Sequence, residues 1–283
     1  MMPRFLIVMC AAVALLGGLG TLRAAGEQTG YLDVVPDIAR VVPPPPRRSD
    51  ARYDADRRVF RATRSMLSSP RGLLATRDVA YTMPDLMHDF SCAAGVQLSP
   101  EGTPLTYRLL TKADTDTQNA NEAAKRNWKR LRPFQIDPGP VCQSKAELAK
   151  SYDYPSGHTA HGWTVGLILA DLMPDHAPQL LSRARAYGES RIVCGAHNMS
   201  AVEASELGVT VSLQQVKSNP RYLADFAAAK AELQSRSMNP SFTSSGGNCA
   251  AEHALTQKSI LADLPLWVTV RRYARHRTNQ TLR

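Results

Sequence analysis

The segment YPSGHTAHGWTVGLILADLMP, residues 154–174, decides the fold expected for this chain. Ser156 and Gly157 form a helix start, because serine is a favoured residue at the N-cap. Six apolar residues carry the helix onward, namely Trp163, Val165, Leu167, Ile168, Leu169 and Leu172, and Pro174 ends it. The apolar part is only about a dozen residues long, which is too short for a membrane span. The segment therefore predicts a helix of a globular domain.

Helical patterns also dominate on both sides of this segment. The expected helices run from about Pro104 to Leu131, stopped by Pro133, then over 177–191 and 220–236, with a short turn at 145–150. Thr103 and Pro104 give the first of them a clear start, because proline is favoured at the first helical position. No long stretch alternates polar and apolar residues as a strand would. The sequence therefore predicts an all-α fold.

Three short clusters combine cations, small residues and histidines, and the second cluster contains the helix start at Ser156 and Gly157. They are Lys125 with Arg132-Pro133, then Pro155-Ser156-Gly157-His158, then Ser190-Arg191 with His197. Arginine suits phosphate because its planar fork donates two parallel hydrogen bonds, and a helix start offers free backbone N–H groups to an anion. Each cation alone is weak evidence, since surface Lys and Arg are usually solvated. Together the clusters predict a cleft for a phosphate-like oxyanion.

The two histidines of these clusters are the reactive candidates. One imidazole can attack phosphorus as a nucleophile, and a second can protonate the leaving oxygen. His158 and His161 are three residues apart and could share a metal, but no third ligand is evident. We therefore expect phosphoryl transfer through histidine, with no metal or other cofactor.

The full pattern Lys125-x6-Arg132-Pro133, PSGH at 155–158 and Ser190-Arg191-x5-His197 resembles the three-part signature of the phosphatidic acid phosphatase type 2 superfamily. This superfamily also contains the vanadium haloperoxidases. The residues beside the motifs resemble the bacterial class A non-specific acid phosphatases; they are Tyr154, Thr159, Ala160, Gly162, Trp163 and Cys194-Gly195.

This resemblance implies an all-helical protein that hydrolyses small phosphate monoesters without a metal. By the same resemblance, His197 is the nucleophile that forms a phosphohistidine, and His158 is the acid that protonates the leaving alcohol. Five residues would hold the phosphate oxygens, namely Lys125, Arg132, Ser156, Gly157 and Arg191. The resemblance also implies a homo-oligomer.

One position departs from the family pattern. The third motif of the family ends with an aspartate four residues after the nucleophilic histidine, and this chain has Ala201 there. If the segment is helical, four residues are about one turn, so the aspartate would lie beside the imidazole. Ser200 carries no charge, and Glu203 would point away. A slow enzyme is therefore expected, unless a carboxylate from elsewhere in the chain takes this place.

The N-terminus has the pattern of a secretory signal peptide. Arg4 precedes an apolar run over residues 5–19, and the small residues Ala24 and Ala25 follow. We therefore expect a periplasmic or secreted protein, with an uncleaved N-terminal anchor as the alternative because Arg23 makes the cleavage site imperfect. The expected divisions are a signal peptide over 1–25, a proline-rich arm over 26–56, the acid phosphatase domain over 57–238, and a C-terminal loop and basic tail over 239–283. The arm is either wrapped on the domain or flexible.

Cysteine content and charge narrow the function further. Four cysteines remain after residue 25, namely Cys92, Cys142, Cys194 and Cys249, and an exported chain favours disulfides with the pairing left open. The net charge of +9 comes without a nucleic-acid-binding motif, so no nucleic acid partner is expected. No mature segment is long enough for an integral membrane protein. The alternatives to the phosphatase are a silent phosphate-binding protein and a vanadate-dependent haloperoxidase.

Overall fold

The computed structural model describes residues 29–237 and 249–264, and within these ranges it contains helices and no strand. The helices are α1 Ala51–Thr63, α2 Pro70–Arg77, α3 Met83–Ala94, α4 Pro104–Trp128, α5 Lys145–Leu148, α6 Gly157–Leu172, α7 Ala177–Cys194, α8 Met199–Lys217, α9 Pro220–Ser237 and α10 Cys249–Thr256. The all-α fold is thus confirmed. The predicted signal peptide and most of the basic tail lie outside the described residues. None of the described helices is long and apolar enough to cross a bilayer.

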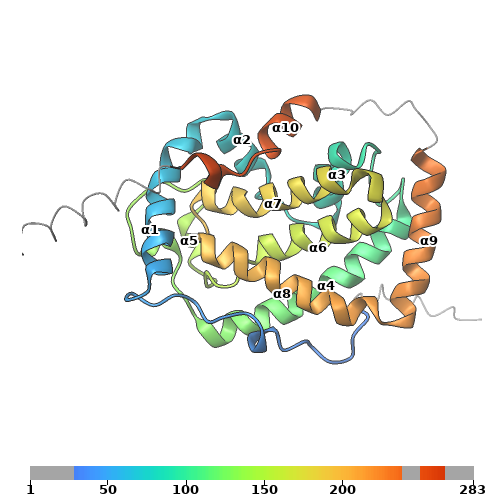
Figure 1. The fold of residues 1–283 in the computed structure, drawn as a ribbon, viewed down its shortest axis with the longest axis horizontal. Helices are drawn as coiled ribbons and strands as arrows, with labels where there is room; N and C mark the ends of the chain where they lie inside the picture. Colours follow the sequence, from blue (N-terminus) through green and yellow to red (C-terminus); the bar gives the residue numbers. More distant parts are fainter. Residues whose placement is uncertain (1–28, 238–248, 265–283) are drawn as a thin grey trace, which may run out of the picture.

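Helix α6 lies at the centre of the fold, as its apolar sequence predicts. Figure 1 shows α6 and α7 side by side in the middle of the molecule, with α8 and α4 below them. The two central helices approach closely because α6 has glycine where they touch. A Cβ atom at Gly162 would lie 2.5 Å from Tyr187, and one at Gly166 would lie 2.4 Å from Ala184. Larger residues at these positions would force the two helices apart.

The order of the helices brings the three sequence clusters to one end of the bundle. Helices α6, α7 and α8 follow one another through short connections and pack in contact. The start of α6, the end of α7 and the start of α8 therefore lie at the same end (Figure 1). The end of α4, which carries Lys125, also reaches this end, because Lys125 lies beside Gly157 at the start of α6.

Helix α4 is shorter than the sequence predicts. It ends at Trp128 instead of Leu131, and Lys129 at its C-cap has the left-handed φ of 47°. Arg132, seven residues after Lys125, therefore does not lie on the helix face that carries Lys125. Arg132 lies in the following loop, and this frees its side chain to approach the pocket from a different direction.

The proline-rich arm packs against the helices over its described part, which runs below α8 and across the C-terminal end of α4 in Figure 1. The backbone N–H of Tyr31 donates to Asp116 at 2.7 Å, and its hydroxyl donates to Asp225 at 2.9 Å. Ile38 and Val42 are buried in an apolar cluster between α4 and α8. Helix α1 runs across the boundary that the sequence suggested between residues 56 and 57.

Two disulfides resolve the pairing that the sequence left open. Cys92 of α3 joins Cys249 of α10, with their Cα atoms 5.3 Å apart. Cys142 joins Cys194 at the end of α7, with their Cα atoms 4.8 Å apart. The second disulfide attaches the loop before α5 to the end of the bundle where the clusters meet.

Candidate active site

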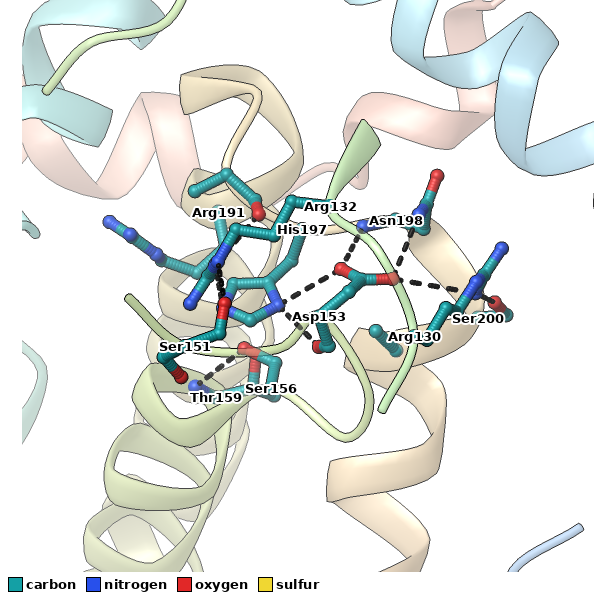
Figure 2. A network of polar contacts seen from close by, with 12 residues as sticks. Arg130, Arg132, Ser151, Asp153, Ser156, Thr159, Arg191, His197, Asn198 and Ser200 are labelled. Carbon is teal, nitrogen blue, oxygen red and sulfur yellow. Dashed lines mark hydrogen bonds and ion pairs between the residues drawn. The ribbon is translucent and has the colours of Figure 1, made fainter. Parts of the chain in front are cut away.

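A pocket of about 330 Å³ opens at this end of the bundle. Five of the seven predicted site residues line it, namely Lys125, Arg132, Gly157, His158 and His197. The other two, Ser156 and Arg191, are fully buried beside it. Figure 2 shows Arg132, Arg191 and Ser156 gathered around His197. The structure therefore brings together all seven residues, which come from three separate clusters of the sequence.

Arg191 is buried, and only part of its guanidinium is hydrogen-bonded within the described residues. Its Nη2 donates to the side-chain oxygen of Gln143. Its Nε and Nη1 are also buried, and they have no hydrogen-bond partner among the described residues. Burial lowers the pKa of this guanidinium to about 10. Since buried donors are normally paired, these two are suited to acceptor oxygens of a bound anion.

Lys125 and Arg132 add two more cations. The Lys125 ammonium pairs with Glu122 at 2.5 Å, and an added Cβ at Gly157 would lie 3.4 Å from it. The Arg132 guanidinium donates through Nε to the carbonyl of Ser151 at 2.9 Å and through Nη1 to the carbonyl of Ala196 at 2.9 Å. Burial lowers the pKa of both cations. The protein therefore keeps positive charge where it is poorly hydrated, which strengthens attraction to an anion.

His197 is buried, and its two nitrogens have different partners. Nδ1 lies 2.7 Å from the backbone carbonyl oxygen of Asp153 and 3.2 Å from its side-chain oxygen Oδ1. Nε2 lies 2.9 Å from Nη1 of Arg132. Carbonyl and carboxylate oxygens only accept, and a guanidinium only donates, so Nδ1 carries the proton and Nε2 the lone pair. Burial, together with Arg132 and Arg191, lowers the pKa of His197 well below its usual value and keeps this form neutral.

Asp153 is the residue that sequence reasoning missed. It lies in the loop before α6, it is fully buried, and its carboxylate accepts from both the backbone and the side chain of Asn198, at 3.1 and 2.8 Å. Burial raises the pKa of this carboxyl, against the lowering effect of Arg130 and Asn198. Its position two residues before the PSGH motif is the only signal that the sequence offers.

His197 lies just before a helix and not within one. Helix α7 ends at Cys194, and α8 begins at Met199 with Asn198 as its N-cap. Gly195 makes the turn between them with a φ of 81°. His197 lies in this turn, so helical spacing does not describe how it relates to Ala201.

His158 is held by the loop between α2 and α3, which sequence reasoning also missed. Its Nε2 lies 3.0 Å from the carbonyl oxygen of Val79, an acceptor, and its ring centroid lies 4.5 Å from that of Tyr81. Burial and Arg191 lower the pKa of His158 well below its usual value. Ser156 is the N-cap of α6, and its hydroxyl oxygen accepts from Thr159. The helix start faces the pocket through Gly157.

Comparison with known proteins agrees with this geometry. The model of the PAP2 superfamily matches residues 110–215, a range that contains all seven site residues. An acid phosphatase of Zymomonas mobilis is 37% identical over 193 residues, which cover 68% of this chain and 73% of the relative. The chain belongs to the PAP2 superfamily. Non-specific acid phosphatases of Salmonella typhimurium and Providencia stuartii are 31% and 30% identical, over 69% and 70% of this chain and 79% and 81% of their own length.

The resemblance drawn from the three motifs is therefore confirmed at the level of the PAP2 superfamily. Within the described ranges of this PAP2 protein, no three His, Cys, Asp or Glu side chains group as metal ligands would. His161, the partner suggested for His158 in a shared metal site, instead lies 2.8 Å from a carboxylate oxygen of Asp114.

The lowered pKa of His197 makes a prediction about stability and pH. The unfolded chain binds a proton on this histidine below about pH 6.5, and the folded PAP2 domain does not. Stability therefore falls as the pH drops below 6.5, by up to about 1.4 kcal/mol per pH unit for this one group. We expect His197→Asn to have a shallower loss between pH 6.5 and 5 in urea unfolding. Parallel curves for parent and variant would contradict the prediction; other titrating groups, such as Asp89 and Glu206, contribute equally to both.

Loss of the disulfide Cys142–Cys194, next to the pocket, is expected to lower activity, whereas loss of the distant disulfide Cys92–Cys249 is not. Removing either by a double Cys→Ala change should cost about 2–4 kcal/mol of stability, because each closes a long loop. Only Cys142→Ala/Cys194→Ala should also lower kcat/KM, because Gln143, which follows Cys142, holds Arg191. The matched control is Cys92→Ala/Cys249→Ala. Equal activity of the two folded variants, measured well below their melting temperatures, would contradict this.

Proposed function

We propose that this protein is an exported acid phosphatase that hydrolyses phosphate monoesters through a phosphohistidine on His197. The observation that carries the proposal is the buried Arg191 guanidinium, with two donors unpaired among the described residues, beside a neutral imidazole. Those donors suit phosphate oxygens, and the imidazole lone pair suits attack on phosphorus. The acid phosphatases among the relatives support the same chemistry.

In the first step, Nε2 of His197 attacks the phosphorus atom. A P–N bond forms while the P–O bond to the alcohol breaks, and His158 gives its proton to the leaving oxygen. Arg132, which contacts Nε2 in the structure, exchanges this contact for a phosphate oxygen. Lys125, Arg191 and the start of α6 hold the oxygens. Phosphoryl transfer depends mainly on such positioning and charge stabilisation.

His158 must be protonated before it can act as the acid. Burial and Arg191 favour its neutral form in the free protein. A bound phosphate brings negative charge into the pocket and favours the protonated form, and an acidic medium adds to this effect. In the second step, His158 takes a proton from water, the water oxygen attacks the phosphohistidine, and phosphate and His197 are released.

Export is part of the proposal. The N-terminal segment over residues 1–25 has the pattern of a signal peptide, and the two disulfides are typical of oxidising compartments such as the periplasm and the medium. The proposed substrates are small phosphate monoesters, because the pocket of about 330 Å³ is polar and opens to solvent.

The test is phosphate release from an aryl phosphate by the purified mature protein between pH 4 and 7. Turnover without added metal supports the proposal. Phosphate binding without turnover would overturn it in favour of a phosphate-binding protein. Halide oxidation that requires added vanadate would overturn it in favour of a haloperoxidase.

A further inference from the structure

The pocket has a carboxylate beside His197 even though the family position for it holds alanine. We propose that Asp153 is the positioning residue for His197, replacing from the loop before α6 the aspartate that this chain lacks at Ala201. This inference rests on the proposed function and extends it to a residue outside the three motifs. Its role would be to orient the imidazole and to stabilise the positive charge that develops on it when Nε2 bonds to phosphorus.

Asp153 contacts His197 through two oxygen atoms, and each contact has a different effect on the imidazole. The backbone carbonyl oxygen lies 2.7 Å from Nδ1 and fixes which nitrogen carries the proton. The side-chain oxygen Oδ1 lies 3.2 Å from the same Nδ1 and brings negative charge to the ring. Figure 2 shows both oxygens on the side of the ring opposite Arg132. Asp153 thus both fixes the tautomer of His197 and places negative charge beside its ring.

The polar contacts of Asp153 hold its carboxylate in place and oppose the rise in its pKa that burial causes. Asn198 donates to both side-chain oxygens, through its backbone N–H to Oδ1 and its side-chain amide to Oδ2. Nη1 of Arg130 lies 3.5 Å from Oδ2. Since Asn198 is the N-cap of α8, the positive end of the helix dipole also faces this carboxylate.

A second buried carboxylate lies in the same network without touching the histidine. Asp56 of α1 pairs with Nη2 of Arg130 at 2.7 Å and accepts from the backbone N–H of Ser200 at 2.9 Å. Asp56 therefore contacts the same Arg130 and the same N-terminal end of α8 as Asp153, and both carboxylates are buried. Asp56 is the matched control that separates a role in supporting α8 from a role in orienting His197.

The side chain of Ala201 lies outside this polar network. Its side chain is fully buried in an apolar cluster with Ile38, Val42, Ala120, Ala124, Tyr154 and Ala204. Its carbonyl oxygen accepts from the backbone N–H of Ser156 at 3.0 Å. An aspartate at this position would place a charge among apolar groups, which costs stability.

The experiment compares Asp153→Asn with Asp56→Asn in steady-state kinetics and in inhibition by inorganic phosphate. We expect Asp153→Asn to lower kcat by about 10²-fold, since one charged group near the transition state is worth about that much. The Ki for phosphate should change less than about threefold, because the anion's own contacts remain. Asp56→Asn should lower the melting temperature while keeping kcat within about threefold of the parent.

A second variant keeps the inference testable if Asp153→Asn misfolds. If Asp153→Asn does not fold, Asn198→Ala should still lower kcat, on the order of 10-fold, because it loosens the carboxylate. Equal kcat losses in the Asp153 and Asp56 variants, an unchanged kcat in the folded Asp153→Asn, or a tenfold gain in Ala201→Asp would each overturn the inference. An inactive parent would instead overturn the proposed function, so the two failures are distinct.

Discussion

Replacing His197 by alanine is expected to lower kcat by at least about 10⁴-fold, because it removes the atom to which phosphorus is transferred. The remaining cations would still bind phosphate, so the Ki for inorganic phosphate should change much less than kcat. Rapid mixing of the parent protein with an excess of aryl phosphate, followed by an alkaline quench, should trap phosphate on the protein. The same experiment on His197→Ala should trap none.

The control for this variant is His88→Ala. His88 lies on α3 with an exposed side chain, and it contacts Asp89 instead of the pocket. It should keep full activity and the same amount of trapped phosphate as the parent. Substantial turnover in folded His197→Ala, or phosphate trapped on it, would assign the nucleophile to another group.

Replacing Arg191 by methionine is expected to lower kcat/KM by about 10²–10³-fold without lowering the stability of the protein. The guanidinium is fully buried, and burial lowers its pKa to about 10. Two of its donors find no acceptor in the described part of the chain. A buried cation that is only partly paired destabilises the folded state, and an apolar residue of similar size relieves that cost. The free energy of unfolding should therefore stay equal or rise.

The matched control is Arg185→Met on the same helix. Arg185 is partly exposed and pairs with Glu189 at 2.7 Å, so this variant loses the same charge away from the pocket. Its kcat/KM should stay near that of the parent. Inorganic phosphate should raise the melting temperature of the parent and of Arg185→Met, but much less that of Arg191→Met. A clear loss of stability in Arg191→Met with phosphate binding intact would contradict the assigned role.

The sequence by itself determined the helical class, the central helix and the residues that gather at the pocket. The helical class and the central helix are local features: the apolar residues over 157–172, the N-cap Ser156 and the glycine at 195 act on their own neighbours in the chain. The three motifs also resemble the signature of the PAP2 superfamily, and two of them lie directly at a helix end, at the start of α6 and the end of α7.

Only the tertiary structure decided which carboxylate serves His197. Asp153 and His197 are 44 residues apart, and their contact depends on how the loop before α6 packs against the turn before α8. The same holds for the disulfide pairs, for the approach of Arg132 from a loop instead of a helix, and for His158 held by Val79. Such contacts arise from the packing of segments distant in sequence, and no local pattern of residues encodes them.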